Sequence, residues 1–154
     1  LVDLCDSVKP SVQDFGREMI TKRFREEDGE VYMMKLSQHP TREMQQFATH
    51  FLKQTASDQP EIILNLEFYF RTVMGAVSAG RVAKDRVLGF LKIEAKKDER
   101  VAALALNLWN DYVVTCAIGD KAAYLEAIFM VQKDWPNQVA KLKVLAVEKR
   151  EVRV

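Results

Sequence analysis

This chain of 154 residues has few of the features that mark secreted, membrane-spanning or strongly nucleic-acid-binding proteins. Its only two cysteines, Cys5 and Cys116, lie in apolar helical patterns, so we interpret them as buried free thiols of a reducing compartment rather than as a disulfide. Its longest apolar stretch, residues 61–77, is interrupted by an amide and by charges of both signs, which argues against a membrane span. The net charge of +1 argues against a binder driven by overall positive charge, although a local basic face can lie within a neutral total.

The sequence also lacks a secretion signal and the usual elements of cofactor chemistry. No basic-then-apolar segment opens the chain, so we expect a cytoplasmic, intracellular protein. The chain begins at Leu1 within an apolar pattern, which we interpret as a fragment of a longer protein. Residues 75–80 do not match a phosphate-binding loop, and neither His39 nor His50 has a cysteine or carboxylate at metal-ligand spacing. We therefore predict no cofactor, no metal and no small-molecule ligand, and we interpret His39 as a solvated or capping side chain.

What the sequence does contain is an internal similarity. Residues 33–54 predict one helix, a short turn at 39–41 and a second amphipathic helix. The same pattern occurs 32 residues earlier, where Leu36, Gln45 and Phe47 fall on Leu4, Gln13 and Phe15, and Met44, Ala48, Phe51 and Leu52 fall on Val12, Gly16, Met19 and Ile20. The matched positions are mainly apolar or small, as expected of side chains that face a neighbouring helix. A helical hairpin that recurs at this interval is typical of an α-solenoid.

Helical periodicity continues through most of the chain. The most apolar predicted helix, residues 60–78, has a nearly encircling apolar surface and is expected to be central, while the next, residues 81–97, places Val82 on its inward face. The predicted helix boundaries are Pro10 as a start, Asp58 with Glu61 as a capping box, Asp120 as a cap, Gly29, Gly80 and Gly119 as helix ends, and Trp135 to Asn137 as a stop. We predict one helical domain over residues 1–137 and a tail over residues 138–154 that is a helix or a mobile extension.

Helical hairpins with proline between the helices, a small residue in the second helix (Gly16 and Ala48) and aliphatic stripes on both helices resemble HEAT and armadillo-type repeats. The resemblance is strongest over residues 1–56 and looser over residues 57–135. It implies an all-α fold, a right-handed superhelix of about seven antiparallel helices whose concave face binds another macromolecule. The function it implies is that of a non-catalytic scaffold or adaptor module. We expect such a module to bind a protein partner and not a membrane.

Basic residues cluster in the predicted helix at residues 81–97. Arg81, Lys84, Lys92 and Lys96 can fall within one broad sector of that helix and form a basic stripe. One interpretation is a solvated face balanced by nearby acidic residues. The other is a surface that binds phosphates of nucleic acid or an acidic protein partner.

A second hypothesis assigns the chain to DNA-interacting proteins. Trp109 and Asp111 supply an aromatic ring and a carboxylate, which resemble the ingredients of HEAT-like DNA glycosylases if Asp111 lies beside Arg100 or Lys84. The family's motif is absent, and Trp109 in an apolar stripe is typical of a core residue. A third hypothesis is a capping segment that closes a longer repeat array.

Overall fold

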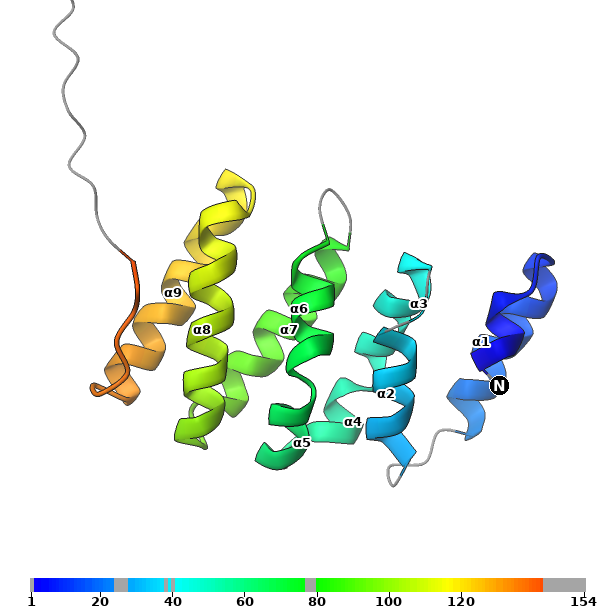
Figure 1. Ribbon diagram of the computed structural model, residues 1–154, viewed down its shortest axis with the longest axis horizontal. Coiled ribbons are helices and arrows are strands. Elements are labelled where there is room, and N and C mark those ends of the chain that lie inside the picture. The colour runs from blue at the N-terminus through cyan, green and yellow to red at the C-terminus, as the bar shows by residue number, and fades with distance from the viewer. Residues whose placement is uncertain (1, 24–27, 38, 40, 77–79, 143–154) are drawn as a thin grey trace, which may run out of the picture.

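A computed structural model describes residues 2–23, 28–37, 39, 41–76 and 80–142, and within these residues the regular structure is entirely helical (Figure 1). The predicted all-α class is therefore confirmed. None of the described helices is long and apolar enough to cross a membrane. The elements are η1 Val2–Asp6, α1 Pro10–Arg23, α2 Gly29–Ser37, α3 Arg42–Phe47, η3 Ala48–His50, α4 Leu52–Ala56, α5 Pro60–Asn65, α6 Glu67–Met74, α7 Arg81–Glu94, α8 Glu99–Thr115 and α9 Ile118–Asp134.

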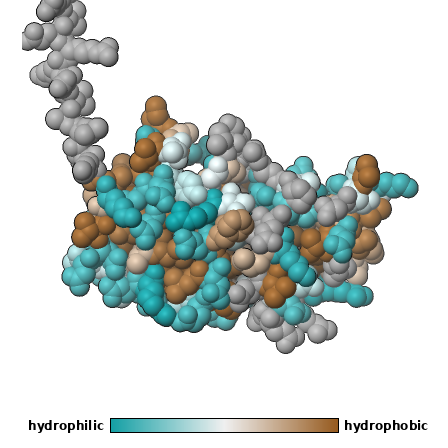
Figure 2. Space-filling model, viewed as in Figure 1, coloured by the Kyte–Doolittle hydropathy of each residue, from teal (hydrophilic) through white to brown (hydrophobic). Residues whose placement is uncertain are grey.

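The helices stand side by side in a row with two layers (Figure 1). One layer contains α2, α5 with α6, and α8, which pack against one another in that order. The other contains α3 to α4, α7 and α9, in which α7 packs against both α4 and α9. The η1 and α1 elements pack together at one end of the row. On the face seen in Figure 2, hydrophobic and hydrophilic residues are intermixed.

The core lies between the two layers. Tyr69 and Phe70 of α6, Leu91 of α7, and Leu108 and Trp109 of α8 are fully buried. Since α6 packs against α2, α3, α7 and α8, the predicted central position of the apolar segment is confirmed for this helix. Trp109 is a core residue, as its apolar pattern indicates.

Two predicted helices are divided, so the described chain has nine α-helices rather than about seven. The helix predicted to run from the turn at 39–41 to residue 55 is interrupted by η3. There the Thr49 hydroxyl donates to the Gln46 carbonyl oxygen at 2.7 Å, and the Phe51 amide bonds to Ala48 three residues back. The backbone bond to the third residue back marks the change from α-helical to 3₁₀ geometry at this point.

The segment predicted as a helix over residues 60–78 is divided at Leu66 and ends at Met74. The Leu66 amide bonds to both Ile62 and Ile63 carbonyl oxygens, at 3.0 and 3.2 Å, and this tightens the chain locally. Residues 77–78 lie outside the described residues. Gly80 does not end this helix: it has a φ of +77° and stands at the N-cap of α7.

Two of the predicted helix caps are wrong. Asp58 has a φ of +60°, and its carboxylate bonds to Lys97 Nζ at 2.7 Å, while Gln59 occupies the N-cap of α5 without a side-chain bond. Asp120 lies inside the first turn of α9, whose N-cap Ala117 also has no side-chain cap bond. In contrast, Pro10 begins α1 and Trp135 is the C-cap of α9, as predicted.

Two predicted glycine ends are also wrong. Gly29 opens α2, and a Cβ added there would lie 2.5 Å from Thr55 Oγ1, so glycine permits α2 to approach α4 closely. Gly119 lies within α9, because α8 already ends at Thr115. Gly16 permits η1 to approach α1 closely, since a Cβ there would lie 2.9 Å from Cys5 Sγ.

Ion pairs at one edge of the row connect successive turns. The buried Glu94 carboxylate accepts from the Asp58 backbone N–H at 3.1 Å and from Lys97 Nζ at 2.8 Å. Hydrogen bonds from Lys97 to Asp58 and then to Glu94 raise the pKa of the Lys97 ammonium. These contacts join the α4–α5 turn to the end of α7.

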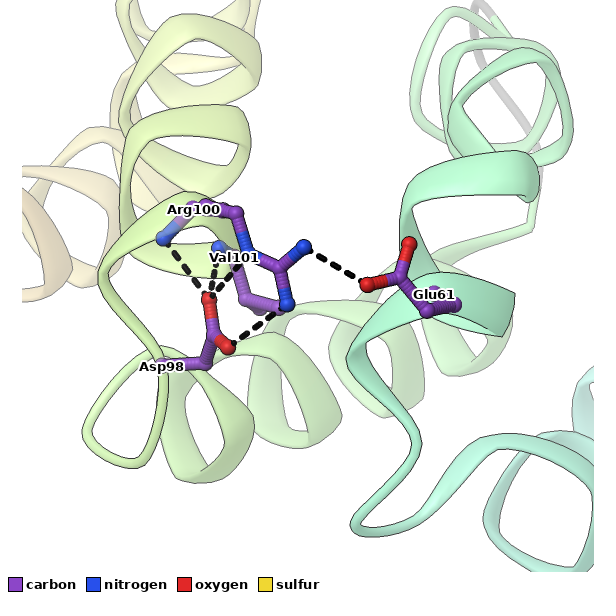
Figure 3. Close-up of polar contacts among 4 residues, drawn as sticks. All are labelled: Glu61, Asp98, Arg100 and Val101. Atoms are coloured by element: carbon purple, nitrogen blue, oxygen red, sulfur yellow. Dashed lines mark hydrogen bonds and ion pairs between the residues drawn. The ribbon is translucent and has the colours of Figure 1, made fainter.

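Arg100, at the start of α8, makes the corresponding link within the other layer (Figure 3). Its guanidinium bonds to Glu61 of α5 at 2.6 Å and to Asp98 at 3.1 Å. Asp98 also caps α8 by accepting from the Arg100 backbone N–H at 2.8 Å. The Arg100 hydrogen bond lowers the pKa of the Asp98 carboxyl group.

The two similar segments share their turn contacts. The Gln13 side-chain amide donates to the Ser7 carbonyl oxygen at 2.7 Å, and the Gln45 amide donates to the His39 carbonyl oxygen at 2.8 Å. The two donors, Gln13 and Gln45, are 32 residues apart, and so are the two acceptors, Ser7 and His39. The alignment made from the sequence therefore matches equivalent positions in space.

A second contact repeats in the same turns. The Lys9 backbone N–H donates to Ser7 Oγ at 3.2 Å, and the Thr41 backbone N–H donates to His39 Nδ1 at 3.1 Å. His39 is thus a turn-capping residue, but it is 4% exposed and not solvated.

The described part of the tail, residues 138–142, has no regular structure, so a helix is absent from these residues. The remaining tail, 143–154, lies outside the described residues. Cys5 is buried and Cys116 half-buried, and the two are not joined by a disulfide.

Candidate functional site

The four basic residues predicted as a binding stripe occupy three different environments. Lys92 Nζ pairs with Glu126 of α9 at 3.2 Å, and Lys96 is exposed beyond the end of α7. Arg81 and Lys84 border a cavity at the opposite end of α7. The structure therefore places two of the four residues together.

The second layer contains a groove that the predicted stripe does not include. It consists of two adjoining hollows of about 480 and 380 Å³, which share His50 and Arg86. One side is formed by residues of α3, η3 and α4, and the other by residues of α7. We call this surface the α4–α7 groove.

Arg86 occupies the centre of the groove. Its Nη1 atom lies 3.2 Å from Thr49 Oγ1 and 3.0 Å from His50 Nε2. Because a guanidinium only donates, His50 Nε2 accepts and the ring is neutral in this arrangement. Burial, and secondly the charge of Arg86, lower the pKa of the His50 ring. Among the described residues no carboxylate pairs with Arg86, whose positive charge faces the groove with neutral partners only.

The groove also presents apolar side chains. Val82 is 63% exposed and Ile93 is 50% exposed, although Val82 was predicted to face inward. Between them lies Gly89, where an added Cβ would meet no atom within 4 Å. The exposed valine, glycine and isoleucine make one side of the groove open and apolar, with Arg86 beside them.

The second candidate site is a cavity of about 810 Å³ at the edge of the row where α6 and α8 end and α7 and α9 begin (Figure 1). We call it the α7–α9 cavity. Its lining includes Arg81, Lys84, Tyr112, Cys116 and Tyr124. Burial raises the pKa of the Cys116 thiol, so the thiol is protonated near neutral pH and does not serve as a nucleophile there.

The residues of the DNA glycosylase hypothesis do not form a site together. The Trp109 ring is fully buried and offers no surface for a base to stack on. Asp111 pairs with Arg71 of α6 at 3.0 Å, rather than with Arg100 or Lys84. Arg100 is itself bonded to Asp98 and Glu61 (Figure 3).

The part of the chain that the structure describes contains no group of three or more histidine, cysteine or acidic residues able to hold a metal. The groove residues Val82, Arg86, Gly89 and Ile93 were missed as a set, although their spacing of four, three and four residues places them on one face of a helix. That signal was present, but Val82 was predicted to face inward.

Comparison of the chain with protein-family models, with curated proteins and with solved structures finds no match. Function is therefore inferred from the groove, the cavity and the hydrogen bonds described above.

Proposed function

We propose that this chain is a non-catalytic helical-repeat module of the HEAT-like α-solenoid type, which binds a segment of another protein in the α4–α7 groove. The observation that carries the proposal is the groove itself, an open channel along α7 that both hollows share at the Arg86 guanidinium. Its lining combines apolar side chains with the charged residues Arg17, Glu43, Lys53 and Asp85. Hydrophobic grooves that receive the apolar side chains of a partner segment are one of the recurring forms of peptide recognition. The shared turn contacts of Gln13 and Gln45 support the repeat assignment.

The chemistry of the groove indicates what kind of segment it binds. Val82 and Ile93 favour apolar side chains, and Arg86 favours a carboxylate because its present partners, Thr49 and His50, are neutral. A charge-assisted hydrogen bond from a guanidinium to a carboxylate is about twice as strong as a neutral one. The partner is therefore a protein segment that carries an acidic residue among apolar ones.

The test is selection from a displayed library of random peptides, followed by fluorescence polarisation with the synthesised peptides. Peptides that combine acidic and apolar residues should be enriched. Arg86→Ala should weaken their binding at least about tenfold, the equivalent of about 1.4 kcal/mol. Gly89→Trp should weaken it as much by filling the groove, without a clash at the backbone, because the space around Gly89 is open.

Gly119→Trp is the matched control, since Gly119 also has no atom within 4 Å of an added Cβ but borders the α7–α9 cavity instead. It should leave peptide binding unchanged. Failure to enrich any peptide over bare support, or binding that both groove substitutions leave intact, would refute the proposal.

The nucleic-acid alternative receives less support, because Lys92 is paired with Glu126 and Trp109 is buried. It makes a separate prediction: binding to single- or double-stranded DNA whose affinity falls steeply with salt. In that case Lys84→Ala should reduce the salt slope by about one per lost phosphate contact.

A further inference from the structure

The α7–α9 cavity has features of a ligand site that the peptide groove does not use. At about 810 Å³ it lies within the size range of small-molecule sites. Apolar surface comes from Met74, Ala76 and the Tyr124 ring, while two cations, Arg81 and Lys84, border the same space. An apolar wall beside convergent charged groups is the usual arrangement for binding an organic ion.

Tyr124 supplies a hydroxyl group to this cavity. The residue is 4% exposed, lines the cavity, and makes no hydrogen bond to any other described residue through its hydroxyl group. Burial raises the pKa of Tyr124 to about 12, with smaller effects from Cys116, Asp120, Asp85 and Tyr112, of which all but Asp85 line the same cavity. The hydroxyl therefore remains protonated and is available as a donor to a bound molecule.

The charges around the cavity are more positive than negative. Within the described chain neither Arg81 nor Lys84 has a carboxylate partner, and Asp120 is the acidic residue of the lining. The cavity also borders the N-terminus of α9, a helix of 17 residues whose N-cap Ala117 supplies no side-chain bond. Uncapped amide groups at a helix start favour an anion, and Asp120 in the first turn of α9 already places one carboxylate there.

We propose that the α7–α9 cavity binds a small organic anion, whose phosphate or carboxylate group lies against Lys84, Arg81 and the first turn of α9. The Tyr124 hydroxyl donates to the anion or to its organic body, and the body packs on the tyrosine ring and the apolar wall. This site is independent of the peptide groove, and it revises the prediction of no small-molecule ligand.

The test measures binding of four probes to the full chain by isothermal titration calorimetry at low and physiological salt. Phenyl phosphate, benzoate and inorganic phosphate supply the anion with and without a body, and benzyl alcohol is the neutral counterpart. At least one organic anion should bind, more weakly at higher salt. If only phenyl phosphate binds, the site takes a phosphate group, and if only benzoate binds, it takes a carboxylate. Inorganic phosphate should bind more weakly than whichever organic anion binds.

Substitutions then locate the site. Lys84→Met should weaken binding at least about tenfold by removing a charge-assisted bond, and Tyr124→Phe about threefold to tenfold by removing one donor. Gly119→Trp should abolish binding by filling the cavity, and Gly89→Trp should have no effect. The proposal is overturned if no organic anion binds, if benzyl alcohol binds equally well, or if circular dichroism shows folded Lys84→Met and Gly119→Trp chains that bind as the unaltered chain does.

Discussion

Glu94 offers a direct test of how far burial determines the strength of an ion pair in this fold. Its carboxylate is 3% exposed and accepts from the Asp58 backbone N–H and from Lys97 Nζ, at 3.1 and 2.8 Å. Glu126 pairs with Lys92 at 3.2 Å, but its side chain is 72% exposed. Each of the two carboxylates pairs with a lysine, Glu94 with Lys97 and Glu126 with Lys92, but only the Glu94 carboxylate is buried.

The expected losses follow from those contacts. Glu94→Ala removes a hydrogen bond to a charged acceptor, worth about 1.5 to 3 kcal/mol, and leaves the Asp58 N–H without that partner. The bond to Lys97 adds little, because the lysine side chain is 42% exposed and screened by water. We expect a total loss of about 3 kcal/mol in the free energy of unfolding, against less than about 1 kcal/mol for Glu126→Ala.

Urea denaturation at neutral pH measures both losses. For a chain of this length a loss of about 3 kcal/mol also lowers Tm by about 6 to 12 °C. Glu94→Gln should be intermediate, because its amide oxygen can still accept from the Asp58 N–H while the ion pair with Lys97 is lost. If Glu94→Ala is no more destabilising than Glu126→Ala, burial does not decide the strength of these contacts and the reasoning is wrong.

Two further predictions concern packing and titration. Gly29→Ala should destabilise the chain by about 1 to 3 kcal/mol, since its Cβ would overlap Thr55, and Thr55→Ala should restore most of the loss in a double-mutant cycle. The pKa of His50 should lie below the ordinary histidine value in an NMR titration, so folding stability falls as the pH drops below that value. Arg86→Gln should raise this pKa without restoring it fully, because burial is the larger cause; an unchanged value would contradict the assigned role of Arg86.

The sequence predicted the class of the fold because that class depends on periodic apolar residues. Tyr69, Phe70 and Trp109 lie at the centre of the core, and helical spacing alone indicates that such residues face neighbours. Helix starts at Pro10 and stops at Trp135 were also predicted correctly, since the geometry of proline is local.

The predictions failed where a residue serves a partner distant in sequence. Asp58 has the composition of a helix cap, yet its carboxylate bonds to Lys97 and its backbone N–H to Glu94, both more than thirty positions away. Thr49 likewise bonds to its own helix and receives a bond from Arg86, and it lies at the break where amphipathic spacing predicts a continuous helix. Such pairings cannot be identified from one sequence, because either use of the side chain satisfies the local pattern.

The candidate sites illustrate the same limit. Lys92 and Lys84 are equivalent in the sequence, as cations on one sector of one helix. The structure pairs the first with Glu126 and leaves the second beside the α7–α9 cavity. Whether a basic residue is available to a ligand therefore depends on the acidic residues of α9, the element that packs against α7.

The internal similarity shows what is shared by two segments that occupy different positions in the row. The turn contacts of Gln13 and Gln45 are equivalent, because they depend only on the turn itself. The burial of matched residues differs between the two segments. Leu36 is fully buried between its neighbours, whereas its counterpart Leu4, at the end of the described row, is 37% exposed. In a repeat array each hairpin is covered by the hairpins on either side, so local hydrogen bonds persist along the array while burial falls at its end. This combination supports the proposed repeat architecture more strongly than the three matching residues in the sequence.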